Sequence, residues 1–181
     1  MAPSAFYTVF RQAVGPLSKE QVAACEVLVD LIAADPFMRD RRWASYALAT
    51  AWHETAHTFR AIEEYGKGKK HSYGQPAGPF GLCYYGRGLV QLTWLANYER
   101  AEKELGIPFV EHPELALEIE HAYAIMSAGM REGWFSKGNT LARYFNDGIT
   151  DYEEARRIIN GIDKAALIAG HARMFHEALA A

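Results

Sequence analysis

The feature that most constrains the fold is the stretch "DRRWASYALATAWHETAH", which runs from Asp40 to His57. It is apolar almost all round from Trp43 to Trp52, and a helix of that kind is usually buried at the centre of its domain. His53 and Glu54 follow directly, where the burial of polar side chains costs free energy. We therefore predict a central helix that begins near Asp40 and carries a functional site at its end.

The rest of the chain predicts a single, mainly helical domain over residues 1–181. A chain of 181 residues, half of them hydrophobic, is long enough to bury one substantial core. In the N-terminal helical segment, residues 1–39, Ser18 and Gln21 have the spacing of a capping box that starts a helix, and Asp35-Pro36 ends it. Further helices are predicted within residues 94–106, 113–133, 140–145, 151–160 and 163–180, with caps from Thr150 and Asp163.

One long segment is predicted to be a surface loop. Residues 65–81, "YGKGKKHSYGQPAGPFG", are rich in Gly, Pro and Lys, and loops of this length in compact domains are usually functional or mobile. Three roles are open for Lys67, Lys69 and Lys70: shaping a cleft, contacting an anionic surface, or solubility alone. Residues 83–93, "CYYGRGLVQLT", follow and predict a short strand or β-hairpin.

The composition argues against several classes of protein. The formal net charge is -3, with acidic and basic residues mixed along the chain, and no basic stripe indicates nucleic-acid binding. The N-terminus lacks the pattern of a secretory signal, and no run approaches the ~18 apolar residues that would cross a bilayer. With only Cys25 and Cys83, no disulfide framework is expected. We expect synthesis in the cytoplasm and, as the default, a monomer that neither inserts into membranes nor binds nucleic acid.

The end of the predicted central helix, "HETAH", matches the H-E-x-x-H pattern of zinc peptidases. In that interpretation His53 and His57 bind zinc from one helix face, and Glu54 is the general base. The extended pattern fails, because Arg60 and Glu63 stand where it needs Gly and His. Nothing in the spacing singles out a third ligand among the downstream candidates Glu114, Glu118 and Glu120. We prefer a site without metal or cofactor, in which His57 is a surface or hydrogen-bonded side chain, and keep the zinc-dependent peptidase as an alternative.

The same residues also fit a glycosidase that uses two carboxyl groups. Inverting glycosidases hold a protonated acid and an ionised base about 6.5–9.5 Å apart, with the attacking water between base and sugar. Glu54 is followed by Glu63 and Glu64, but ten residues of continuous helix would separate Glu54 from Glu64 by about 15 Å. This interpretation therefore requires the helix to end soon after His57 and the chain to fold back. The alternative for Glu63 and Glu64 is an ordinary solvated acidic pair.

Three motifs occur in the order that is typical of glycoside hydrolase family 19. They are His53-Glu54-Thr55, then "YGRGLVQLTWLANY" from Tyr85 to Tyr98, then Ile158-Ile159-Asn160-Gly161. Residues 40–181 resemble this family of plant-type chitinases, and resemble more closely the short phage and prophage endolysins that share its fold. The resemblance implies a lysozyme-superfamily fold, a mainly α, two-lobed domain with a small β-hairpin beside the active-site cleft. It also implies that the protein is a glycoside hydrolase.

The resemblance assigns roles to the residues at matching positions. Glu54 corresponds to the general acid and Glu64 to the general base that activates water, and Glu63, one residue earlier, stays open as the base. Thr93 corresponds to the residue that helps to hold this water. The implied substrate-binding residues are His53, Tyr85, Arg87, Gln91, Asn97 and Asn160.

The chemistry of these residues agrees with the implied roles. A carboxyl group at the end of a largely buried helix is expected to keep its proton near neutral pH, because burial disfavours the charged form. Tyr84, Tyr85 and Trp94 are candidates for stacking on sugar rings. The alternatives are a place in the core for Trp94 and a helix C-cap for Asn160.

Departures from the plant enzymes favour the phage branch. Leu89 replaces the small residue or proline that usually follows G-R-G, and the arginine that follows I-I-N-G has no clear counterpart. The implied activity is hydrolysis of β-1,4 bonds in the glycan strands of peptidoglycan during phage lysis, with chitin as the alternative substrate. The implied setting is synthesis in the cytoplasm and release to the cell wall or periplasm by a holin-type partner that permeabilises the membrane.

Overall fold

The computed structural model describes residues 4–181. Over this range the chain forms a mainly helical fold with one small antiparallel sheet. The α-helices are α1 (Ser4–Val14), α2 (Lys19–Ala34), α3 (Arg41–Glu54), α4 (Leu95–Leu105), α5 (Ile119–Glu132), α6 (Leu141–Tyr144) and α7 (Ala165–Ala178). The sheet pairs β1 (Ile62–Glu63) with β2 (Arg87–Gly88), and the 3₁₀-helices are η1 (Ser72–Gly74), η2 (Pro113–Leu117) and η3 (Glu154–Ile158).

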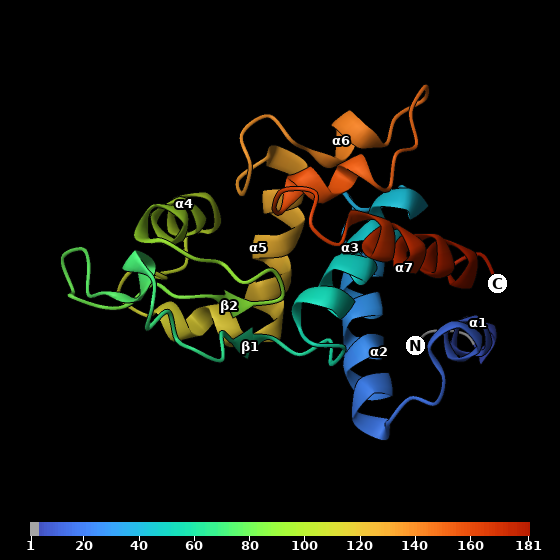
Figure 1. The fold of residues 1–181 in the computed structure, drawn as a ribbon, viewed down its shortest axis with the longest axis horizontal. Coiled ribbons are helices and arrows are strands. Elements are labelled where there is room, and N and C mark those ends of the chain that lie inside the picture. The colour runs from blue at the N-terminus through green and yellow to red at the C-terminus, as the bar shows by residue number, and fades with distance from the viewer. Residues whose placement is uncertain (1–3) are drawn as a thin grey trace.

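The elements form two groups at the two ends of the long axis (Figure 1). α1, α2, α3 and α7 lie at one end, α4 and the β1–β2 sheet lie at the other, and α5 lies between them. α3 packs along α7, which also packs on α1, whereas α5 contacts α4 and β2. This arrangement confirms the mainly helical, two-lobed fold with a small sheet that the motifs imply.

α3 is the central helix that its apolar sequence predicts. All residues from 44 to 52 are buried. The helix begins after Asp40, whose side chain accepts a hydrogen bond from the backbone N–H of Arg42 at 2.8 Å and so forms the N-cap. It ends at Glu54, three residues before His57, and Thr55 is the C-cap residue.

The N-terminal helices join this core through a capping box and an aromatic cluster. The backbone N–H of Gln21 donates to the Ser18 side chain at 3.1 Å, and the Gln21 side chain accepts from the Ser18 backbone at 2.8 Å, which confirms the predicted capping box. α2 ends at Ala34, as the Asp35-Pro36 pair predicts. Rings from α1, α3, α7 and the segment after α3 pack together in a cluster of Phe6, Phe10, Trp52, Phe59 and Phe175.

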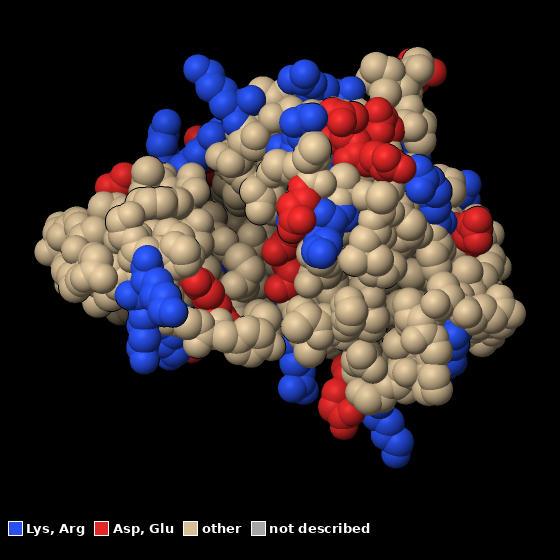
Figure 2. All heavy atoms as spheres, in the orientation of Figure 1, with Lys and Arg blue, Asp and Glu red and all other residues tan. Residues whose placement is uncertain are grey.

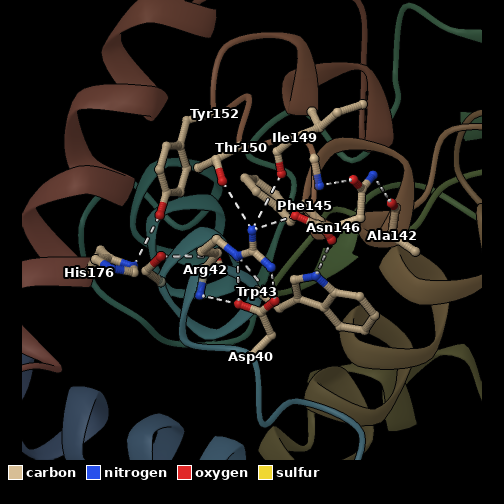
Figure 3. Close-up of polar contacts among 12 residues, drawn as sticks. Asp40, Arg42, Trp43, Ala142, Phe145, Asn146, Ile149, Thr150, Tyr152 and His176 are labelled. Carbon is tan, nitrogen blue, oxygen red and sulfur yellow. Dashed lines mark hydrogen bonds and ion pairs between the residues drawn. The ribbon is translucent and has the colours of Figure 1, made fainter.

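Arg42 links the start of α3 to the segment between α6 and η3 (Figure 3). Its guanidinium forms an ion pair with Asp40, and Nη1 donates to the carbonyl of Asn146 at 2.8 Å and to Oγ1 of Thr150 at 3.0 Å. The indole N–H of Trp43 donates to a neighbouring backbone carbonyl, that of Phe145, at 3.2 Å. These contacts connect residues about a hundred positions apart in the chain, and they hold the first turn of the central helix against the segment between α6 and η3.

The caps predicted for the last two helical segments are wrong. Asp151, and not Thr150, accepts backbone N–H groups at the start of η3, at 3.1 and 3.0 Å. The Thr150 hydroxyl is already engaged as the acceptor of an arginine N–H. α7 follows Lys164, which has a left-handed conformation and gives no side-chain cap. The carbonyl of Asp163 instead accepts a hydrogen bond from Nε of Arg156 at 3.1 Å.

The hairpin predicted over residues 83–93 is present only as a narrow turn. Arg87 and Leu92 form an isolated bridge across it, whereas β2 pairs with β1, so that Glu63 lies opposite Arg87. The sheet therefore connects the segment after α3 to the turn of the Y-G-R-G motif.

The surface is hollowed between the two groups of elements (Figure 2). Acidic and basic side chains lie next to one another along the wall of this hollow on the side of α7. Among residues 4–181, no helix combines the length and the apolar composition that a membrane span would need.

Candidate active site

Glu54, the predicted general acid, is the last residue of α3 and lies in an ion pair. Its Oε1 is 2.6 Å from Nη1 of Arg156, a residue of η3. Both groups are largely buried, with 17% of the Glu54 side chain and 4% of the Arg156 side chain exposed.

The chain reverses directly after Glu54, so the helix ends before His57 and not soon after it, and the chain folds back as the two-carboxylate interpretation requires. Thr55 is fully buried, and its hydroxyl donates to the carbonyl of Ala51 at 2.7 Å and accepts from the N–H of Phe59 at 2.9 Å. Ala56, His57 and Phe59 all have positive φ angles. Such conformations cost about 1–3 kcal/mol each in non-glycine residues, and here the Thr55 hydroxyl and the burial of the Phe59 ring stabilise them.

This reversal removes the helical spacing on which the zinc pattern depends. Because α3 ends at Glu54, His57 does not lie one helical turn beyond His53 on the same face. The His57 ring stacks on Trp52 with the centroids 4.5 Å apart, and its carbonyl accepts a hydrogen bond from Gln21 at 2.9 Å. Within the described part of the chain, no three His, Cys, Asp or Glu side chains form a group that could hold a metal ion.

His53, a predicted substrate-binding residue, is partly buried next to the acid. Burial lowers the pKa of the His53 imidazole, while the charge of Glu54 raises it and that of Arg156 lowers it. The imidazole is therefore neutral at pH 7, and one ring nitrogen can accept a hydrogen bond while the other donates one.

Glu64, the predicted base, follows β1 and is held by uncharged donors. Its carboxylate accepts hydrogen bonds from the Tyr73 hydroxyl at 3.1 Å and from the backbone N–H of Gly86 at 3.2 Å. The backbone N–H of Glu64 donates to the carbonyl of Gly86 at 2.7 Å. A Cβ at position 86 would lie 2.8 Å from Oε1 of Gln91 and 3.3 Å from Cβ of Glu64, so a larger residue would require the Gln91 side chain to move. The Y-G-R-G motif therefore brings its backbone against the predicted base.

Glu63 has charged partners instead. Its Oε1 accepts a hydrogen bond from the Tyr85 hydroxyl at 2.5 Å, its Oε2 is 2.9 Å from Nζ of Lys67, and Nε of Arg87 lies 3.9 Å away. The hydrogen bonds from Tyr85 and Lys67 lower the pKa of the Glu63 carboxyl group. A carboxylate with a lowered pKa is a weaker base, so the surroundings favour Glu64 over Glu63 as the general base.

Arg87 and Tyr85, two predicted substrate-binding residues, form part of the fold itself. Arg87 is 6% exposed, and its Nη1 donates to the carbonyls of Cys83 and Tyr85 and to the Tyr98 hydroxyl, at 3.1, 3.4 and 3.1 Å. The guanidinium lies 3.7 Å from the centroid of the Tyr85 ring. These contacts place Arg87 beneath the turn, where it supports the motif and does not extend toward a ligand.

Gln91, Thr93 and Asn97 hold the turn between β2 and α4. Nε2 of Gln91 donates to the carbonyls of Ile62 at 3.1 Å and Gly88 at 3.3 Å, which links the turn to β1. Nδ2 of Asn97 donates to the carbonyl of Thr93 at 2.8 Å at the start of α4. All three side chains are partly exposed, so their remaining polar atoms can meet a ligand.

Asn160 lies on the segment that carries the partner of Glu54. Its backbone N–H donates to the carbonyl of Arg156 at 3.1 Å, and its Oδ1 accepts the N–H of Gly161 at 2.8 Å. With Ser136 and Asn139 it lines a polar pocket of 290 Å³. The I-I-N-G motif therefore begins two residues after Arg156, the arginine that contacts the predicted acid.

Among the three aromatic residues considered for sugar stacking, Trp94 has an exposed ring. Tyr84 and Tyr85 are buried, and the hydroxyl of Tyr84 donates to the carbonyl of Val110 at 2.8 Å. Trp94 is 49% exposed, so the alternative that places it in the core is wrong.

Two residues of the site were not predicted from the sequence. Arg156 lies in "EEARRIING", where a pair of arginines is typical of an ordinary helix surface, and its contact with Glu54 joins residues 102 positions apart. Tyr73 lies in the glycine-rich loop, and only the fold brings its hydroxyl to Glu64. The one available signal for Arg156 is its place two residues before the I-I-N-G motif.

Comparisons with known proteins agree with the motifs. No protein-family model matches the chain. An endochitinase of Arabidopsis thaliana is 39% identical over 77 residues, which are 41% of this chain and 26% of the endochitinase. The crystal structure of a bacterial family 19 chitinase matches with a TM-score of 0.60 and 22% identity, over 95% of this chain and 93% of that one. The fold is that of the family 19 chitinases.

Two further chitinase structures show the same fold. Chitinase C from Streptomyces griseus matches with a TM-score of 0.58 and 21% identity, over 96% of this chain and 75% of that one. A class IV family 19 chitinase from Zea mays matches with a TM-score of 0.57 and 20% identity, over 97% of this chain and 90% of that one. The chain is thus chitinase-like in fold and, over part of its length, in sequence, and it spans about a quarter of the Arabidopsis endochitinase.

Proposed function

We propose that this protein is a glycoside hydrolase that cleaves β-1,4 bonds in glycans containing N-acetylglucosamine. The observation that carries the proposal is a pair of carboxyl groups in a family 19 chitinase-like fold. Glu54 ends the buried helix α3, and the chain reverses at Thr55 and returns through β1 to Glu64. In the proposed reaction Glu54 donates a proton to the glycosidic oxygen, Glu64 removes a proton from water, and this water attacks the anomeric carbon with inversion.

The surroundings of the two carboxyl groups support different roles. Tyr73 and Gly86 orient the Glu64 carboxyl group without adding a positive charge. Glu54 must carry its proton when the bond breaks, and a bound glycan that excludes water favours this neutral form. Arg156 opposes it, so the proposal requires the ion pair to open when substrate is bound.

Two polymers fit this chemistry. Chitin has the stronger support, since the Arabidopsis relative and the matching solved structures are named chitinases. Peptidoglycan is the second candidate, which the resemblance to phage endolysins implies. In its favour, Lys69 and Lys70 are exposed on the loop that leads to Tyr73, and Lys and Arg atoms gather where Figure 1 draws the segment between β1 and η1 (Figure 2). Such charges attract the carboxylates of peptidoglycan peptides.

Three matched variants test the proposed roles by steady-state hydrolysis of both polymers. Glu54→Gln and Glu64→Gln should each lower kcat by about 10²–10⁴-fold. Glu63→Gln is the control, because it changes the neighbouring carboxylate, which is paired with Lys67, and it should keep most of the activity. Full activity of Glu54→Gln would overturn the proposal, and loss of activity in Glu63→Gln but not in Glu64→Gln would assign the base to Glu63.

The rates of the wild-type protein on the two polymers decide between them. If peptidoglycan is the substrate, replacing both Lys69 and Lys70 by Gln should slow its hydrolysis and leave that of uncharged chitin unchanged. Equal effects on both polymers would remove the structural argument for peptidoglycan. Phage lysis and release by a holin-type partner stay predictions from the sequence.

A further inference from the structure

Trp94 combines an exposed ring with a strained backbone. It precedes α4 with 49% of its surface exposed and a φ of 71°, a conformation that is unusual for a bulky residue. Its N–H donates to the carbonyl of Tyr84 at 2.8 Å, and its carbonyl accepts the N–H of Asn97 at 3.0 Å. The surrounding backbone therefore fixes this conformation, although the half-exposed ring gains little packing energy. Strain that is maintained without a packing benefit is typical of ligand-binding positions.

The Trp94 ring is connected to the predicted base through one side chain. The Tyr73 ring meets Trp94 edge to face, with the centroids 5.3 Å apart and the planes at 77°. The hydroxyl of the same Tyr73 donates to Oε1 of Glu64 at 3.1 Å. His71 stacks on the Tyr73 ring at 4.9 Å. The exposed indole thus contacts the Tyr73 ring, and the Glu64 carboxylate contacts the hydroxyl of the same residue.

The glycine-rich loop fixes Tyr73 in this position. The backbone of Gly74, the next residue, crosses that of Gly68 so closely that a Cβ on Gly74 would lie 2.0 Å from the Gly68 carbonyl oxygen. Before the crossing, Lys67 is anchored by its ion pair with Glu63 at 2.9 Å. The long loop is therefore constrained on the side from which Tyr73 extends.

We propose that Trp94 is a sugar-stacking residue beside Glu64 and that Tyr73 is a positioning residue for Glu64. The ligand is a pyranose ring of a β-linked glycan of N-acetylated amino sugars, whose apolar face covers the exposed indole. A sugar on Trp94 also restrains the Tyr73 ring, and through its hydroxyl the orientation of the base. The inference rests on the proposed function, because it places Trp94 on the base side of the same site.

Kinetics separate the two roles. Trp94→Ala should raise KM for an N-acetylglucosamine oligomer about tenfold with little change in kcat, and Trp94→Phe, which keeps a ring, should recover most of the loss. Tyr73→Phe keeps the ring but removes the hydroxyl from Glu64, so it should lower kcat with little change in KM. Phe37→Ala removes another exposed aromatic ring, in the connection between α2 and α3, and should behave like the wild type.

A measurement of binding without turnover distinguishes a failure of this inference from a failure of the proposed function. The N-acetylglucosamine oligomer is titrated calorimetrically into Glu54→Gln protein, with and without Trp94→Ala, after thermal unfolding has shown both proteins to be folded. About tenfold weaker binding with Trp94→Ala supports the inference. Unchanged binding overturns it and leaves the proposed function intact. If the wild-type protein cleaves neither polymer, the proposed function itself is wrong.

Discussion

At the scale of single residues, the contact between Glu54 and Arg156 has the largest consequences. A buried ion pair adds little net stability, because both charges lose their hydration, but removal of one partner leaves the other charge buried and unpaired. Arg156 is 4% exposed and cannot lose its proton. The pair therefore makes the stability of the protein sensitive to the same residue that we propose as the acid.

We expect Glu54→Gln to lower the free energy of unfolding by about 1–3 kcal/mol, because the amide cannot compensate the Arg156 charge. Adding Arg156→Met should restore most of this stability without restoring activity. Urea denaturation of the single and double variants measures both effects. Glu64→Gln is the matched control, since its partners Tyr73 and Gly86 are uncharged. A Glu54→Gln protein as stable as the wild type would mean that the ion pair is absent in solution.

At the scale of the elements, the end of α3 is set by one hydroxyl group. Thr55→Val should cost about 1–3 kcal/mol, because the buried N–H of Phe59 loses its acceptor. It should also lower kcat, because the reversal that follows Glu54 loses its anchor. Thr55→Ser keeps the hydroxyl and should preserve stability and activity. Equal behaviour of the two variants, in urea denaturation and hydrolysis, would show that the hydroxyl does not set the reversal.

A second prediction concerns the loop over residues 65–81. Gly74→Ala should lower activity strongly, because the new Cβ would lie 2.0 Å from the carbonyl oxygen of Gly68 and the loop, with Tyr73, must move. Gly66→Ala is the control from the same loop, since a Cβ there would meet no atom within 4 Å. Hydrolysis assays compare the two variants, and similar activities would show that the position of the loop does not matter for the reaction.

The elements differ in how well the sequence predicts them. The apolar run of α3 and the capping box of α2 are local patterns, so both helices could be predicted. The two-carboxylate interpretation requires a reversal, but its position directly after Glu54 could not be predicted, because Ala56, His57 and Phe59 adopt positive φ angles that only the tertiary structure stabilises. The cap predicted at Thr150 is wrong for the same reason, since Arg42, from the start of α3, uses that hydroxyl.

At the scale of the whole molecule, stability should depend on pH through histidines from two helices. Burial lowers the pKa of His53, His171 and His176. The unfolded chain, with histidine pKa values of about 6.5, binds more protons than the folded protein at acidic pH. The free energy of unfolding should therefore be highest above about pH 7 and fall between about pH 7 and 5.

Urea denaturation across this range measures the effect, and His171→Gln should flatten the slope. The lowered pKa values of Asp40 and Glu63 act in a separate window, because stability that depends on these carboxylates is lost only below about pH 4.5. A wild-type stability that does not change between pH 7 and 5 would contradict the neutral, buried state of the histidines.

The candidate site was predictable where a motif marks it and not elsewhere. Glu54 stands in the H-E-T motif, and Glu64, at a position that the resemblance assigns, lies against the backbone of the Y-G-R-G motif. Arg87 is also in a motif, yet its side chain is buried under the turn. A sequence pattern does not distinguish a residue that supports a site from one that contacts the ligand. Tyr73 has no local signal and Arg156 has only its nearness to the I-I-N-G motif, since each reaches its partner through the packing of distant segments.

The most direct test of the central claim, a two-carboxylate hydrolase, is mass spectrometry of the fragments that the wild-type protein releases from chitin and from peptidoglycan in the presence of EDTA. We predict glycan fragments with new reducing ends from at least one polymer, unaffected by EDTA. Intact glycan strands, with peptide bonds cut only when EDTA is omitted, would contradict the account and favour a zinc-dependent peptidase.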